Sequence, residues 1–186
     1  MPRYDLPRAA DGPLRVVQLF VNSVDREHGR EWLPTPRALA DFFAAHELSD
    51  GAAVTAADVE QAYRLRDALR ALLRANNGGP VDAGAVAVVN EAARRGGLAL
   101  ALDARGTACV GVHGHAADAA FARIVAVAFE AMLDGSWSRL KACRQCEWVF
   151  WDTSKNRSGS WCSMQICGNR LKTRAYRRRR SAGSRT

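Results

Sequence analysis

Apolar residues recur every three or four positions through most of the first 138 residues, a spacing that places them on one face of a helix. The clearest case follows Thr55 and ends in the breaker-rich stretch that begins at Asn76. Elsewhere a cap residue or a proline marks a helix start, as at Thr35 followed by Pro36. The pattern predicts helices over Leu14–Val24, Thr35–His46, Thr55–Asn76 and Asp82–Arg95, and a last one that starts at His115 or Asp118 and extends towards Trp137. The last of these is the most apolar and is expected at the centre of the core, whereas the valines of the first also permit a strand.

One stretch of this region changes to the spacing of strands. Leu98–Leu102 and Cys109–His113 are runs of small and β-branched residues, and the turn-forming segment Asp103–Gly106 lies between them. The sequence therefore predicts one β-hairpin in an otherwise helical region. Cys109, the one cysteine before residue 140, is expected to be a small core residue.

The other cysteines follow a C-x2-C-x15-C-x4-C pattern near the end of the chain. Each pair has the spacing of a zinc knuckle, and four thiolates complete the tetrahedral shell of Zn²⁺ without leaving a position for water. The N-terminal residues lack the apolar run of a secretory signal, which disfavours disulfides, and a redox C-x-x-C would leave the second pair unexplained. The sequence predicts one structural Zn²⁺ bound by Cys143, Cys146, Cys162 and Cys167.

The residues between and after these pairs predict the fold of the module. Glu147–Asp152 has strand character, and a polar turn is expected to return the chain to Trp161 as a hairpin. No helix breaker follows Gly168, so we expect a helix whose first turn holds the fourth ligand. Knuckle, hairpin, knuckle and helix form a treble-clef-like finger.

Aromatic residues are dense in this module. A domain this small needs a core, so most of the rings are expected to pack inside it. The alternative is that a ring stacks on an unpaired base, and Trp151 is the ring most expected at the surface. The rings concerned are Trp148, Phe150, Trp151 and Trp161.

Charge is distributed unevenly along the chain. Residues 139–186 contain 13 Lys and Arg against two acidic residues, a net charge of +11, whereas residues 1–138 carry −3. This asymmetry indicates a polyanionic partner for the end of the chain, and the alternative is a solvated basic tail that binds nothing specific. At about 100° per residue, four arginines of the predicted helix share a face that can follow a phosphate backbone. The candidate nucleic-acid contacts are Lys155, Arg157, Asn169, Arg170, Lys172, Arg174, Arg177 and Arg178.

The most apolar stretch, Ala116–Leu133, contains Asp118, Arg123 and Glu130, and it therefore predicts a buried helix rather than a membrane span. We expect a cytoplasmic protein without a membrane partner. The predicted fold class is mainly α, with a helical domain over residues 1–138 that carries the hairpin. A zinc finger with its basic helix follows over residues 139–180, and a disordered tail over residues 181–186.

Two parts of the chain resemble known families. Cys167–Arg170 spells the signature of the CGNR zinc finger, and Arg157–Met164 and Cys143–Asp152 are similar to the same family. Phe20–Asp25 and Leu65–Arg70 resemble motifs of the ABATE domain, which is found in stress-induced transcription regulators. The resemblance covers nearly the whole chain. It implies a bacterial, stress-related, zinc-dependent regulator that binds nucleic acid, with DNA favoured over RNA.

Other functions stay open at this point. RNA or single-stranded nucleic acid is the alternative target, and a zinc-braced surface for a protein partner is a further one. A nuclease on the same scaffold needs a histidine and a catalytic metal beside the finger. Residues 143–186 contain no histidine, so no enzyme is predicted. Assembly into a homodimer is also open.

Polar residues on the apolar helices mark a candidate effector pocket. Asn22, Arg66 and Asn90 would need partners if buried, and a small-molecule effector would be one. Hydrogen bonds between helices are the alternative.

Overall fold

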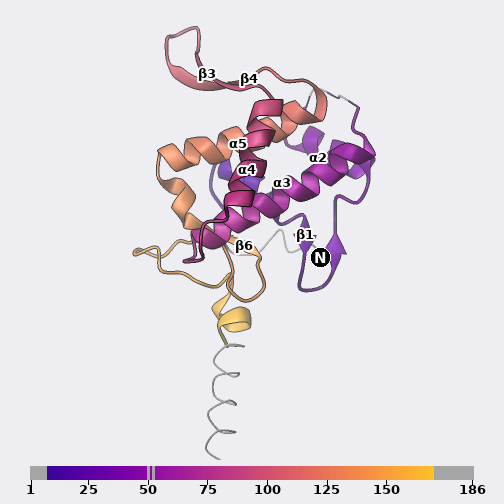
Figure 1. Ribbon diagram of the computed structural model, residues 1–186. Helices are drawn as coiled ribbons and strands as arrows, with labels where there is room; N and C mark the ends of the chain where they lie inside the picture. The colour runs from indigo at the N-terminus through magenta and orange to yellow at the C-terminus, as the bar shows by residue number, and fades with distance from the viewer. Residues whose placement is uncertain (1–7, 50, 52, 170–186) are drawn as a thin grey trace, which may run out of the picture.

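The computed structural model of the protein describes residues 8–49, 51 and 53–169. Within these ranges the chain is mainly helical, as predicted, and short antiparallel ladders join the helices. Figure 1 shows the helices crossing one another in the middle of the molecule, with one hairpin at one end and the cysteine-rich segment at the other. The predicted basic helix and tail, from residue 170 onward, lie outside the described residues. The helices are α1 (Leu14–Val21), α2 (Pro36–Ala45), α3 (Ala56–Ala75), α4 (Ala83–Arg95) and α5 (Ala116–Leu133).

Side-chain caps start three of these helices at the predicted residues. The Thr35 hydroxyl accepts a hydrogen bond from a backbone amide of the first turn of α2. Thr55 and Asp58 form a capping box at the start of α3, in which each side chain binds the backbone amide of the other residue. Asp82 caps α4. α5 ends earlier than predicted, because Gly135 adopts a left-handed conformation with φ of 77°.

α5 lies at the centre of the core, as its composition predicts. Phe121 is fully buried, and its ring lies 6.3 Å from that of Phe20 in α1 and 5.3 Å from that of Phe43 in α2. The contact with Phe43 is the edge-to-face arrangement that aromatic rings prefer. Three helices therefore meet at one ring. In the part of the chain that the structure describes, no helix has both the length and the apolar character needed to cross a membrane.

The predicted hairpin is present. β3 (Leu98–Leu102) and β4 (Ala108–Val112) pair antiparallel and extend away from the helices (Figure 1). The base of the hairpin is tight, since Gly114 donates a 2.8 Å backbone hydrogen bond to Gly96. A Cβ atom at Gly114 would lie 2.7 Å from that backbone, so glycine is needed there.

Cys109 is exposed, so the prediction that it is a core residue is wrong. It lies opposite Ala101 in the outer half of the hairpin. Side chains of this half are open to solvent, and Leu102 beside the turn is 71% exposed. The residue types of the two strands do not reveal how far from the core the hairpin extends.

A second, shorter ladder joins β1 (Val24–Asp25) to β2 (Arg30–Glu31), and the sequence does not predict it. Strands of two residues are too short to show a period. Backbone amides of the turn between them bind the carboxylate of Asp25. The ladder brings Arg26 and Glu31 to α3, where both form ion pairs.

β5 (Leu140–Ala142) and β6 (Val149–Trp151) form a third ladder, which follows a 3-10 helix over Ser136–Arg139. The strand at Val149–Trp151 lies where it was predicted. Its predicted partner is wrong, because β6 pairs with the segment before the first cysteine pair rather than with Trp161 after the polar turn. The first knuckle is itself the turn of this hairpin.

The apolar core of the helical region continues past residue 138, where the sequence predicts that the helical domain ends. Leu140, Ala142 and Val149 belong to the same buried cluster as Phe20 and Leu69. β5 packs on α3 and β6 packs on α1. The first half of the cysteine-rich segment is therefore built onto the helical region.

Candidate metal centre and its contacts with the helical region

The sulfur atoms of Cys143, Cys146, Cys162 and Cys167 all lie within 4.8 Å of one another. Three of the separations are 3.5, 3.6 and 3.7 Å. Four sulfur atoms at the Zn–S distance of about 2.3 Å occupy tetrahedral corners about 3.8 Å apart. The cluster therefore fits one zinc ion, and the four residues that converge are those whose spacing predicts the site.

Backbone hydrogen bonds shape both knuckles. In the first, the Glu147 amide donates to the Cys143 carbonyl at 3.0 Å, and Glu147 has a positive φ of 60° that closes the turn. In the second, Ser163 caps a π-helical turn over Met164–Gly168. The Cys167 amide donates to the Ser163 carbonyl at 2.9 Å. Each turn brings the second cysteine of its pair back to the first.

The four thiols cannot all ionise in this cluster without a cation. Hydrogen bonds with Cys146 and Cys162 lower the pKa of Cys143. The hydrogen bond to Cys143 raises the pKa of Cys146 to about 12, and hydrogen bonds to Cys143 and Cys146 raise that of Cys162. Burial raises the pKa of Cys167. A divalent cation at the centre would displace these protons and neutralise the thiolates.

Aromatic rings surround the sulfur cluster. Trp148 and Phe150 are buried against it, and the half-buried Trp161 packs there too. Trp32 of the helical region packs against the same cluster, a contact that the sequence does not reveal. The guanidinium group of Arg8 lies 5.5 Å from the centre of the Phe150 ring. The metal centre thus includes residues from both ends of the chain.

A buried ion pair braces the loop between the two cysteine pairs. Lys141 Nζ lies 2.8 Å from Asp152 Oδ2, and their side chains are 5% and 1% exposed. Burial opposes ionisation of Asp152, but Lys141 and the amides of Ser154 and Gly159 hold its pKa well below the usual range. A Cβ atom at Gly159 would lie 2.6 Å from this carboxylate. In the sequence Lys141 counts only toward net charge, so the sequence alone does not reveal the pair.

Asn22 joins α1 to the finger hairpin. Its side-chain amide donates to the Val149 carbonyl at 2.8 Å, and its side-chain oxygen accepts from the Val149 amide at 2.8 Å. Gln18 donates to the same carbonyl at 3.1 Å. β5 does not bind this amide and carbonyl of β6, and the two side chains supply their hydrogen bonds instead.

The end of α3 makes a second junction. Asn76 donates to the carbonyls of Trp137 and Leu140 at 2.8 and 2.9 Å. Asn77 donates to the Ala142 carbonyl at 2.7 Å, and its own carbonyl accepts two bonds from Arg144. In the sequence these asparagines predict only a helix stop. Their role at the junction could not be predicted without knowing that β5 packs on α3 in space.

Glu147, next to the ligand Cys146, forms the third junction. Its carboxylate lies 2.7 Å from Arg26 and 2.9 Å from Arg74. Burial opposes ionisation, but the hydrogen bonds with the two arginines outweigh it and lower the pKa of Glu147. The first knuckle is thereby tied to the β1–β2 turn and to α3.

Comparison with known families agrees with this architecture. Residues 14–135 match the model of the ABATE family, described as "Putative stress-induced transcription regulator". The chain belongs to the ABATE family. Residues 139–180 match the CGNR zinc finger, so both resemblances are confirmed. With the cysteine cluster, these matches identify a zinc-binding protein of the regulator type. Among curated proteins, none matches the chain.

Three of the candidate nucleic-acid contacts of this ABATE protein lie among the described residues. Lys155 and Asn169 are exposed. Arg157 is exposed too, but its guanidinium group donates to the Ser138 hydroxyl at 2.6 Å. The other five, Arg170, Lys172, Arg174, Arg177 and Arg178, lie outside the described residues.

The three candidate effector residues have separate surroundings in the ABATE domain. Asn22 binds the finger hairpin through Val149. Arg66 forms a 2.6 Å ion pair with Glu31 and donates to the Ser23 hydroxyl at 3.0 Å. Asn90 is exposed on α4. Contacts within the protein, the alternative to an effector, therefore account for the side-chain amide of Asn22 and the two terminal nitrogen atoms of Arg66, whereas the buried Arg66 Nε atom has no hydrogen-bond partner among the described residues.

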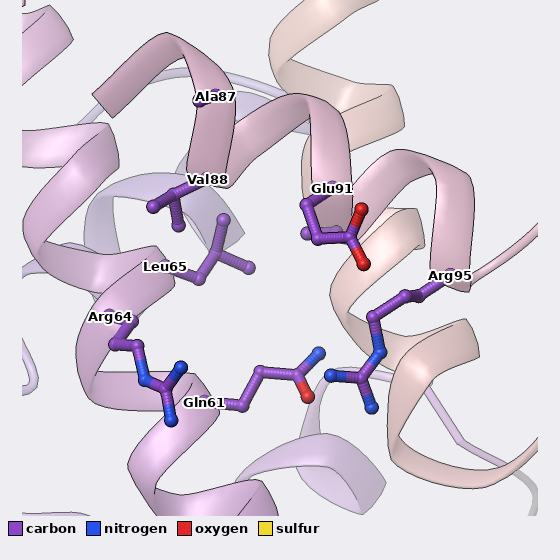
Figure 2. Close-up of a pocket in the computed structure, with 8 residues that line it drawn as sticks. Gln61, Arg64, Leu65, Ala87, Val88, Glu91 and Arg95 are labelled. Atoms are coloured by element: carbon purple, nitrogen blue, oxygen red, sulfur yellow. The ribbon is translucent and has the colours of Figure 1, made fainter. Parts of the chain in front are cut away.

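A pocket of about 250 Å³ lies between α3 and α4 of the ABATE domain, and none of those three residues lines it. Figure 2 shows Leu65 and Val88 between the two helices, with Gln61 and Arg95 at the rim. Gln61 and Arg95 both bind Asp118 of α5, at 2.8 and 3.2 Å. Gln61 and Arg95 at the rim are thus already paired within the protein, whereas Arg64, which also lines the pocket, forms no ion pair with a described residue.

Proposed function

We propose that this ABATE protein is a zinc-dependent, stress-related transcription regulator that binds nucleic acid, with DNA as the favoured target, in the bacterial cytoplasm. One observation carries the proposal, namely the charge of the segment that comes directly after the metal centre. Residues 170–186 follow the fourth ligand, Cys167, after two residues. They contain eight Lys and Arg and no acidic residue. The basic side chains of this segment can neutralise the phosphates of a nucleic acid, and the metal-ordered module beside it would hold the segment in place.

The charge inventory of the finger supports this placement. Five basic residues lie between residues 139 and 169, and four of them donate hydrogen bonds to protein groups. These hydrogen bonds limit the access of a polyanion to the four side chains, whereas Lys155 is exposed in the polar turn after β6. The charge that phosphates would meet is therefore concentrated after Asn169. The four anchored residues are Arg139, Lys141, Arg144 and Arg157.

In this proposal zinc supplies folding free energy rather than catalysis, because four thiolates complete its shell. The protein is accordingly a binding protein and not an enzyme. Arginines of the C-terminal segment contact phosphates, and Asn169 or Arg170 approaches a base edge.

Single-stranded nucleic acid, RNA included, is the second candidate, and one observation favours it. Trp151 and Trp161 are only half-buried. Partly open rings beside basic residues are platforms on which unpaired bases stack. Quenching of tryptophan fluorescence by a single-stranded oligonucleotide, lost in Trp151→Phe, would favour this target over duplex DNA.

Fluorescence anisotropy with labelled duplex DNA, single-stranded DNA and RNA tests the proposal on the zinc-loaded full chain. Replacing Arg174 and Arg177 by alanine is expected to weaken binding and to reduce the salt slope by about 1 for each lost phosphate contact. Arg37→Ala, an exposed arginine of α2, is the matched control and should bind as the wild type does. Equal affinity of the double variant for every nucleic acid would contradict the proposal.

The target is identified by isolating nucleic acid bound to the protein in cells and sequencing it. Enrichment of particular duplex sites supports a DNA-binding regulator. Enrichment of transcripts supports the second candidate. Recovery of an acidic protein without nucleic acid would instead support a zinc-braced protein-interaction surface.

A further inference from the structure

A cavity of about 400 Å³ between α3 and α4 is lined by four arginines, which come from the β1–β2 turn and from α3. Two carboxylates line it as well, and much of the remaining wall consists of small residues. The lining therefore carries a formal excess of two positive charges. The charged residues are Arg26, Arg64, Arg70, Arg74, Asp67 and Asp82.

Arg70 brings a desolvated charge to this cavity. It is 2% exposed, and its guanidinium group binds Asp67 at 3.1 Å and the Val21 carbonyl. Its Nε atom has no hydrogen-bond partner among the described residues. Burial, together with the charge of Arg26, lowers the pKa of Arg70 to about 10. The protein alone does not fully compensate this cation.

The carboxylates are too few to balance the arginines. Asp67 Oδ1 lies 2.6 Å from Arg26 and 3.1 Å from Arg70, so one oxygen atom serves two guanidinium groups. Asp82 is engaged as the cap of α4. Arg64 is exposed and forms no ion pair with any residue that the structure describes. Figure 2 shows Arg64 extending from α3 at the rim of the adjoining pocket, which shares this residue with the arginine-lined cavity.

The cavity is connected to the metal centre through Glu147. Two of its arginines, Arg26 and Arg74, are the groups that hold this carboxylate, at 2.7 and 2.9 Å. Arg74 also lines a hollow of about 280 Å³ whose wall includes Glu147 and the ligand Cys143. A change in the partners of Arg26 and Arg74 therefore reaches the first knuckle directly.

We propose that this cavity binds a small dianion with phosphate or carboxylate oxygens, and that the bound anion competes with Glu147 for Arg26 and Arg74. Guanidinium groups match such oxygens with paired, charge-assisted hydrogen bonds. The volume suits a small molecule. When the anion is bound, the first knuckle loses part of its attachment to the ABATE domain, which couples the cavity to the finger. The proposal does not depend on what the finger binds.

Isothermal titration calorimetry of the zinc-loaded full chain with inorganic phosphate, and separately with succinate, tests the site. We expect one site per chain for at least one probe, and the probe that binds distinguishes phosphate from carboxylate recognition. Arg64→Gln should weaken binding by about tenfold, as expected for a lost charge-assisted hydrogen bond. Arg37→Gln lies outside the cavity and should leave the affinity unchanged.

The basic C-terminal segment also attracts anions, so Arg178→Gln is a second control and should bind as the wild type does. If neither probe binds, the site is overturned. It is also overturned if Arg178→Gln weakens binding while Arg64→Gln does not, because the anion would then be held by the C-terminal segment.

Glu147→Gln tests the competition. Removing the competing charge should raise the affinity for the anion by about threefold or more. In the wild type, the bound anion should speed the release of zinc to a chelating dye, and Glu147→Gln should remove this response. One zinc per chain and unchanged helical circular dichroism establish that the variant is folded. Unchanged affinity in a folded Glu147→Gln would overturn the competition.

Discussion

In the ABATE domain, Phe121 of α5 is enclosed by rings from two other helices, whereas in the finger four sulfur atoms and a few aromatic rings occupy the corresponding central place. The helical core is large enough to order itself by burial of apolar surface. The finger is too small to order itself in this way, and bound zinc would supply the missing folding free energy.

The comparison also divides the finger into two parts. Its first part, from β5 to β6, shares the helical core and is held by Asn22 and by the end of α3. Its second part contains the polar loop and the second knuckle, where Met164 and Ile166 are 48% and 43% exposed. The two parts should therefore depend on zinc to different degrees, although each supplies two ligands.

Removal of zinc should have the largest effect. Structural zinc contributes an apparent binding free energy of roughly 10–16 kcal/mol in finger peptides, so a strong chelator is expected to release one equivalent of metal and to disorder the second knuckle. The β5–β6 hairpin should keep most of its order because it is part of the helical core. Hydrogen exchange read by mass spectrometry can follow both segments, with zinc counted in the same sample.

The matched control is the β3–β4 hairpin, which lies at the other end of the molecule and should exchange equally with and without zinc (Figure 1). If β5 and β6 lose protection together with the second knuckle, the finger is a single metal-dependent unit and the division is wrong. Continued protection of Ser163–Gly168 in metal-free protein would contradict the role of zinc itself.

The helices and the ligands could be predicted from the sequence because both depend on local spacing. Thr55 and Asp58 are three residues apart and form their capping box wherever the helix lies. The two cysteine pairs likewise have the spacing of knuckles, and zinc accepts only a few ligand sets.

The junctions could not be predicted because they join residues that are distant in sequence. The Asn22 side chain meets Val149 across 127 positions. Asn76 and Asn77 predict a helix stop, and nothing nearby indicates that β5 packs against them. The partner of β6 was predicted wrongly for a related reason. The polar turn after Asp152 has the composition of a hairpin turn, whereas the first knuckle, with its metal ligands, is the turn that forms.

Breaking the buried ion pair of the finger should have the next largest effect. Asp152→Asn leaves the Lys141 ammonium group buried without a counter-charge, and loss of one partner of a buried pair costs about 3–5 kcal/mol. The expected result is a lower midpoint in urea unfolding of the zinc-loaded protein and weaker zinc binding in competition with a chelator. The ABATE helices should be affected less than the loop that leads to the second knuckle.

Glu91→Gln is the control for this change, because it breaks an exposed pair with Arg94 on α4. Its unfolding midpoint and zinc affinity should match those of the wild type. If Asp152→Asn behaves like this control, the pair does not brace the loop. The second part of the finger would then depend on zinc without support from this pair.

The smallest of the expected effects concerns the junction at Asn22. Asn22→Leu leaves the buried amide of Val149 without its acceptor, which costs about 1–3 kcal/mol, whereas the Val149 carbonyl keeps its hydrogen bond from Gln18. Asn90→Ala changes an exposed asparagine and should stay within about 0.5 kcal/mol of the wild type.

Hydrogen exchange at Val149–Trp151 gives the decisive measurement. Faster exchange there in zinc-loaded Asn22→Leu means that the Asn22 side chain helps to hold the hairpin, whereas unchanged exchange means that the other contacts of the hairpin hold it without Asn22.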